Sequence, residues 1–177
     1  VDSNTGKIDV STIDGILTVN DAQKDVNVSE SAKAVNATLN GGDLNVSNAE
    51  STATVENVAV SGTGNVVIDN NTGSVDVGTL GGKLTAKNAQ GDINVATSAT
   101  EIEATLNGGN INAENATVGS AKIGTAEGAQ GNAVIGTNTG SIDLVGTFDG
   151  KLTANNAQGD INVAEKAVSY THLTLPT

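Results

Sequence analysis

The chain has 177 residues and a formal net charge of −12, with eight lysines and no arginine. Nucleic acids and anionic membranes are recognised through basic side chains, so this charge argues against both partners. Small aliphatic residues are abundant, but there is one Phe, one Tyr and no Trp, Met or Cys, which argues against an aromatic-filled core, a disulfide framework and a thiolate metal site.

Short strands are predicted at a spacing of nine residues, and no helical pattern competes with them. Each step reads Gly-polar-aliphatic-polar-aliphatic, followed by polar residues and an Ala at the eighth position. This alternation is typical of a half-buried strand, and the Gly and Asn residues between steps suit tight corners. The residues expected to point inward are Ile8, Val10, Leu17, Val19, Val26, Val28, Leu44, Val46, Val75, Val77, Leu84, Ile93 and Val95, with Ala22, Ala49, Ala89, Ala116 and Ala157 at the corners. Those expected to face solvent include Asp9, Asp76 and Asn94.

A longer repeat of 67 residues overlies these steps. Asn-Thr-Gly recurs at Asn4, Asn71 and Asn138, which divides the chain into copies at 4–70, 71–137 and, in part, 138–167. Each unit holds one longer step, which in the first copy is the 13 residues 51–63 with the apolar pairs Ala53/Val55 and Val58/Val60. If this step counts as two, the unit contains eight steps, or four coils of a solenoid.

Strands this short cannot bury an apolar face alone, whereas stacked copies form a continuous core. The sequence therefore predicts an all-β, right-handed parallel β-helix, that is, a single β-solenoid over residues 1–167 with about two nine-residue steps per coil. A three-sided coil remains an alternative. Cut solenoid ends expose unpaired strands, so end-to-end self-association is also expected, opposed weakly by the net charge.

The last ten residues, 168–177, differ from everything before them. They contain the sole Tyr, His and Pro of the chain, at Tyr170, His172 and Pro176. Their sequence, VSYTHLTLPT, resembles the translation of a transposon-end adapter used in preparing sequencing libraries. We expect this tail to be non-native and a poor cap for the solenoid, and we set aside Tyr170 and His172 as catalytic candidates.

The steps GDINV, GGDLNV and GSVDV, with Asn/Thr/Ser/Gly/Ala-rich turns and almost no aromatics, resemble filamentous-haemagglutinin-type and autotransporter-type bacterial adhesins over residues 1–167. A second resemblance is to putative adhesins with repeated SGDI-type rungs, through the Gly-Asp-Ile-polar-Val steps at Gly91 and Gly159. The resemblance implies a secreted, cell-surface stalk that binds an unknown host or bacterial surface ligand, anchored at the outer membrane through other regions. The alternative is a passive spacer or surface-layer component that projects another domain.

No catalytic, cofactor or metal site is predicted, and the chain is not expected to be an enzyme. Calcium-binding β-rolls use GGxGxD turns, which do not occur here. Weak incidental calcium binding is left open at Asp25, Asp43, Asp92 and Asp160.

Polysaccharide cleavage would need paired carboxylates. The candidates Asp9, Asp76 and Asp143 instead occupy equivalent repeat positions. Phe148, at a one-residue insertion, is expected to be a filler in the core rather than a ligand anchor. Asn-X-Ser/Thr sequons occur at Asn27, Asn36, Asn45, Asn70 and Asn115, as expected by chance in an Asn- and Thr-rich chain.

Overall fold

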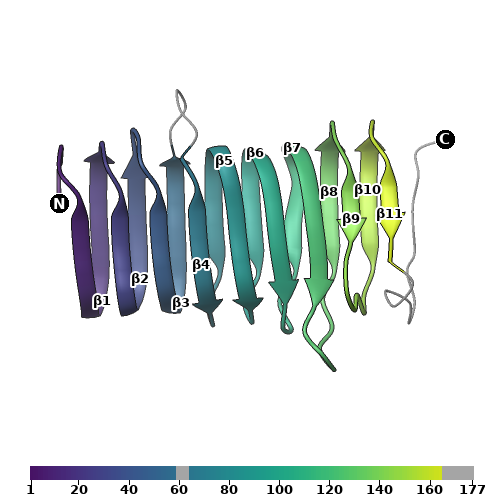
Figure 1. Cartoon of the computed structure of the whole chain (residues 1–177), viewed down its shortest axis with the longest axis horizontal. Coiled ribbons are helices and arrows are strands. Elements are labelled where there is room, and N and C mark those ends of the chain that lie inside the picture. The colour runs from purple at the N-terminus through teal and green to yellow at the C-terminus, as the bar shows by residue number, and fades with distance from the viewer. Residues whose placement is uncertain (59–63, 165–177) are drawn as a thin grey trace.

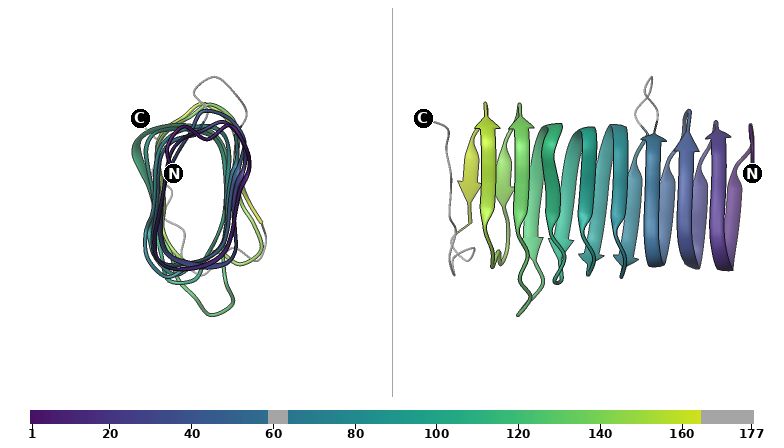
Figure 2. Two further views of the ribbon diagram at one scale, coloured as in Figure 1. Left: turned by 90° about the vertical axis from the view of Figure 1, so that its left-hand side faces the viewer. Right: turned by 180° about the vertical axis from the view of Figure 1, so that it is seen from behind.

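A computed structural model describes residues 1–58 and 64–164, and the tail at 168–177 lies outside this part of the chain. The described residues contain no helix and form one sheet in which all named strands pair in parallel, wound right-handedly into a solenoid of about eight turns (Figures 1 and 2). The fold class predicted from the sequence is confirmed. The strands are β1 (Ile8–Ala22), β2 (Val26–Leu39), β3 (Leu44–Val58), β4 (Val66–Asn71), β5 (Val75–Ala89), β6 (Ile93–Leu106), β7 (Ile111–Thr125), β8 (Ala133–Asn138), β9 (Ile142–Leu144), β10 (Leu152–Ala157) and β11 (Ile161–Val163).

Each coil has two flat faces, which settles the choice between two and three sides. The long strands bend at a corner, so β1 contributes 8–10 to one face and 17–19 to the other. We call the face that contains residues 8–10 face A and the face that contains residues 17–19 face B. In Figure 1 face A runs downward and face B upward, so the chain passes from B to A at the upper edge and from A to B at the lower edge (Figures 1 and 2).

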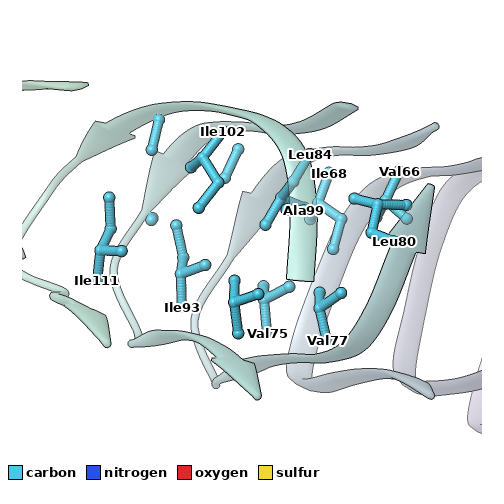
Figure 3. Close-up of a cluster of buried hydrophobic side chains, with 14 of the residues drawn as sticks. Val66, Ile68, Val75, Val77, Leu80, Leu84, Ile93, Ala99, Ile102 and Ile111 are labelled. Atoms are coloured by element: carbon cyan, nitrogen blue, oxygen red, sulfur yellow. The ribbon is translucent and has the colours of Figure 1, made fainter. Parts of the chain in front are cut away.

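The core is the predicted column of small aliphatic side chains. Figure 3 shows Val75, Ile93 and Ile111 in one row, opposite Ile68, Leu84 and Ile102. All the residues predicted to point inward are buried except Val10 and Ala157, which are partly buried against the same core. Both exceptions lie in the first and last coils of the described part of the chain.

The prediction of four coils per 67-residue unit is wrong. The strand segments of the first unit begin at residues 8, 17, 26, 35, 44, 53 and 66, which makes seven segments, or three and a half coils. The step over 51–63 contributes one face-B segment, because Ala53 pairs with Val75 and the next segment begins at Val66. The described part of this step therefore contains one strand segment, while Val60 lies outside the described residues.

An odd number of segments per unit places equivalent residues on opposite faces. Ile8 lies on face A, Val75 on face B and Ile142 on face A again. In the same way, β3 ends with Val58 at the upper edge, whereas β7 ends with the equivalent residue, Thr125, at the lower edge (Figure 1). The two copies are therefore related by half a turn about the solenoid axis.

The third copy carries its extra residue at a corner after β9. Phe148 is fully buried there, close to the isolated bridge between Thr125 and Thr147. This placement agrees with its predicted role as a filler at an irregular position, where the small residues of the regular step would leave space.

Candidate functional site

Hydrogen-bonded polar ladders cover the centre of both faces. On face A, Asn27 Nδ2 donates to Asp9 Oδ1 at 2.7 Å, and Asn45 Nδ2 donates to Asn27 Oδ1 at 2.9 Å. On face B the equivalent side chains make the same ladder: Asn94 to Asp76 at 2.6 Å and Asn112 to Asn94 at 2.9 Å. A third copy begins on face A, where Asn162 donates to Asp143 at 2.7 Å.

The three carboxylates considered for polysaccharide cleavage belong to these ladders. Asp9, Asp76 and Asp143 each lie at the start of a ladder and accept hydrogen bonds from the next coil. They lie on alternate faces, so the structure does not bring any two of them together as an acid and base. Asp9 is exposed, whereas Asp76 and Asn94 are half-buried because neighbouring rungs cover them.

A second kind of ladder ties the coils together at the edges. At the upper edge, the backbone N–H of Asp43 donates to Asp25 Oδ1 at 3.2 Å, and that of Asn65 to Asp43 Oδ1 at 2.7 Å. At the lower edge, the N–H of Asn110 donates to Asp92 Oδ1 at 2.9 Å, followed by Asn132 to Asn110 Oδ1 at 2.9 Å. The side chains thus satisfy corner N–H groups that the strands leave free.

The four residues considered for calcium are not gathered into one site. Asp25 and Asp43 are neighbours at the upper edge, Asp92 lies at the lower edge, and Asp160 is exposed near the end of the described solenoid. Lys7 Nζ lies 2.9 Å from Asp25 Oδ2 and lowers the pKa of that carboxyl, with a further contribution from the N–H of Asp43. Within 1–58 and 64–164, no three His, Cys, Asp or Glu side chains are arranged to hold a metal ion.

One cluster of charged side chains lies on face A. Lys83 contacts Glu101 at 3.0 Å and also contacts Glu103, while Lys122 lies 3.4 Å from Glu103. The hydrogen bond from Lys83 is the main reason that the pKa of Glu103 is lowered. The side chains are about one-third exposed or more, so the cluster stabilises the fold only modestly.

The sequons fall on surface positions of two kinds. The side-chain amides of Asn27 and Asn45 are hydrogen-bonded in the face-A ladder. Asn70 belongs to a further amide ladder, in which its side chain donates a hydrogen bond to Asn48 at 3.0 Å. That ladder continues through Asn88 and Asn107 at 3.0 and 2.9 Å and was not predicted. Asn36 and Asn115 are exposed.

Two shallow grooves at the edges were also missed by sequence reasoning. The upper groove has a volume of about 380 Å³ and is lined by hydroxyl groups that include Ser98, Thr117 and Thr139. The lower groove, of about 230 Å³, is lined by Ser31, Glu50 and Thr72 among others. The three positions in one groove are each 67 residues from those in the other, a spacing that is visible in the sequence once the grooves are known.

A scan against protein-family models, a search of curated proteins and a search of solved structures each found no match. Within the described residues, no helix has the length and apolar character needed to cross a membrane.

Proposed function

We propose that this chain is an extracellular, repetitive stalk segment of a large bacterial surface adhesin, which attaches to host cells, to surfaces or to other bacteria. The observation that carries the proposal is the repetition of one outward-facing surface along a rigid solenoid. The Asp-Asn-Asn ladder beginning at Asp9 recurs from Asp76 on the other face. Repeated presentation of one surface favours attachment through many weak contacts, because avidity rises steeply with valency.

Attachment, rather than turnover of a substrate, is proposed because the candidate catalytic carboxylates are separated and engaged. Asp76 accepts hydrogen bonds from Asn94 at 2.6 Å and from Ser74 at 2.8 Å, which fixes it as a structural acceptor. Asp143 accepts hydrogen bonds from the equivalent residues of the third copy, Asn162 and Ser141. Secretion to the cell surface belongs to the same proposal.

A passive spacer is the second candidate. The observation that favours it is that the face ladders satisfy one another: Asn27 and Asn94 each donate to one neighbouring rung and accept from the next. Such ladders stiffen a rod without needing an outside partner. In this case the solenoid would only hold another domain away from the cell.

Beads carrying the full chain would separate the two candidates. Their retention would be measured under flow on epithelial cells, on bacterial lawns and on glass. Matched control beads would carry the Ile93→Asp chain, which differs from the parent by one residue and has a disrupted core. Retention of folded-chain beads above control beads on at least one surface supports the adhesin, and equal retention on all three contradicts it in favour of the spacer.

A further inference from the structure

We propose that the two edge grooves are equivalent binding sites for a neutral polysaccharide chain, one site in each 67-residue repeat and on opposite edges of the rod. This inference rests on the proposed attachment function and names both its surface and its ligand class. It is argued from the lining of the grooves, from their duplication and from the charge around them.

The upper groove runs along the solenoid axis across successive coils. Its hydroxyl groups come from Thr79, Ser98, Thr100, Thr117 and Thr139. Thr79, Ser98 and Thr117 pair in register from coil to coil. Neighbouring coils of a parallel sheet lie about 4.8 Å apart, so these three hydroxyl groups form a row along the axis, with Thr100 and Thr139 beside it. An extended chain of similar units can therefore lie in the groove and meet one hydroxyl after another.

Most of these hydroxyl groups are free to bind a ligand. Thr100 Oγ1 donates to the carbonyl oxygen of Gly81 at 2.8 Å. In the described part of the chain, the side chains of Thr79, Ser98, Thr117 and Thr139 make no hydrogen bond. Each hydroxyl can donate one hydrogen bond and accept others, which matches the hydroxyl groups of a sugar.

The remaining lining adds an apolar floor at the same edge. Leu80 and Ala99 lie beneath the hydroxyl row and are almost fully buried, while Gly81 and Gly119 have no side chain to fill the groove. A sugar ring presents apolar C–H groups as well as hydroxyl groups. Mixed hydroxyl and aliphatic walls therefore suit it better than they suit an ion.

The duplication of the groove is an independent observation. Ser31, Glu50 and Thr72 line the lower groove at the positions equivalent to Ser98, Thr117 and Thr139. The lining differs in detail, because Thr72 Oγ1 donates to the carbonyl oxygen of Glu50, which leaves Ser31 as the hydroxyl available for a ligand. Asn48 and Asn70 also line this edge, but their amides are hydrogen-bonded within the protein: Asn48 donates to the carbonyl oxygen of Glu30 at 2.6 Å and Asn70 to Asn48 at 3.0 Å. Because the unit contains seven strand segments, the second groove opens on the opposite edge from the first.

The charge of the molecule selects against anionic polysaccharides. No lysine lines either groove among the described residues, and Glu50 contributes a carboxylate to the lower one. The net charge of −12 repels sulfated and uronic-acid chains at long range. With no aromatic side chain for stacking, each groove binds weakly, and strong attachment requires many repeats.

The test uses the ¹⁵N-labelled full chain and four probes: maltohexaose, cellohexaose, mannohexaose and, as the anionic comparison, hexagalacturonate. Amide signals are followed by two-dimensional NMR up to millimolar probe. At least one neutral probe is expected to shift signals of Ser98, Thr100 and Thr117 and of Glu50 and Thr72. The proposal is overturned if no neutral probe shifts them, if shifts map to the face ladders instead, or if hexagalacturonate binds best.

The double variant Ser98→Ala/Thr117→Val removes two upper-groove hydroxyls at exposed or half-exposed positions with little change in shape. It should weaken upper-groove binding by roughly tenfold, from two lost hydrogen bonds, and leave the lower groove unchanged. The matched control, Thr18→Val/Thr153→Val, removes hydroxyls on face B outside the grooves and should bind as the parent does. Equal weakening by both double variants would contradict the assignment.

Bead retention distinguishes failure of this inference from failure of the proposed function. If parent beads are retained and beads carrying Ser98→Ala/Thr117→Val are retained equally on every surface, the grooves are not the attachment sites although the chain is adhesive. If parent beads are not retained on any surface, attachment itself fails, and groove binding in the NMR experiment would then describe a non-adhesive site.

Discussion

Residues 4–70 and 71–137 repeat one sequence, yet they present equivalent side chains to opposite sides of the rod. The ladder at Asp9, Asn27 and Asn45 lies on face A, and its copy at Asp76, Asn94 and Asn112 lies on face B. The cause is only the odd number of strand segments in the unit. Sequence equivalence and spatial equivalence are therefore separate properties in a two-sided solenoid.

The copies also differ in how closely their corners are packed. A Cβ added to Gly82, in the second copy, would lie 2.2 Å from the carbonyl oxygen of Gly64 in the preceding coil. The equivalent residue in the first copy is Gly15, where an added Cβ meets nothing within 4 Å. The first copy forms the N-terminal end of the described solenoid, so the same glycine is required in one copy and is permissive in the other.

A charge placed in the core of the second copy should destabilise the protein more than any other change considered below. Ile93→Asp leaves an unpaired carboxylate among fully buried side chains and should cost more than about 4 kcal/mol. Its equivalent, Val26→Asp, should unfold chiefly the terminal coils, because solenoid coils interact mainly with their neighbours. Urea unfolding monitored by circular dichroism measures both, and equal losses would contradict this difference between the copies.

Gly82→Ala and Gly15→Ala test the difference in corner packing directly. Gly82→Ala forces a side chain against backbone and should lower the free energy of unfolding by about 2 kcal/mol. Gly15→Ala should be neutral or slightly stabilising, since alanine reduces the conformational entropy of the unfolded chain. Thermal unfolding of the two variants provides the measurement, and a loss at Gly15 as large as at Gly82 would show that the first corner is not open.

Inserting whole steps between Thr72 and Gly73 tests the half-turn relation with little expected change in stability. A copy of residues 82–90 adds one segment and should bring both grooves to the same edge. A copy of residues 82–99 adds two segments and keeps them on opposite edges. With spin labels on Glu50→Cys and Thr117→Cys, the one-step insertion should shorten the label distance and the two-step insertion should lengthen it. A lengthening in both would contradict the seven-segment unit.

The charged cluster should contribute least, and it is absent from the first copy because Ile16 and Asn36 occupy the positions equivalent to Lys83 and Glu103. The pKa of Glu103 is lowered, so its stabilisation is present at neutral pH and is lost as pH falls through the pKa of the folded state. Lys83→Met should raise that pKa and cost less than about 1 kcal/mol. An NMR titration of the Glu103 carboxyl that shows no change would remove Lys83 as the cause.

The sequence was enough to predict the fold and the inward residues, because each step repeats the same alternation and solenoid cores repeat the same contacts. It was not enough for the number of coils: the pairs Ala53/Val55 and Val58/Val60 look like two strands, and only pairing of Ala53 with Val75 shows that one segment is present. The edge grooves were not predictable because each is built from coils that are distant in sequence. The face-B position of Asn94 likewise depends on the count of segments before it.

The seven-segment unit also determines what happens when the number of copies changes. Adding or deleting one complete repeat would rotate everything on its far side by half a turn, so features that pointed toward a target would point away. Adding or deleting two repeats would restore the original direction. A rod with matching sites on both edges tolerates either change, because every rod of two or more copies presents sites on both edges.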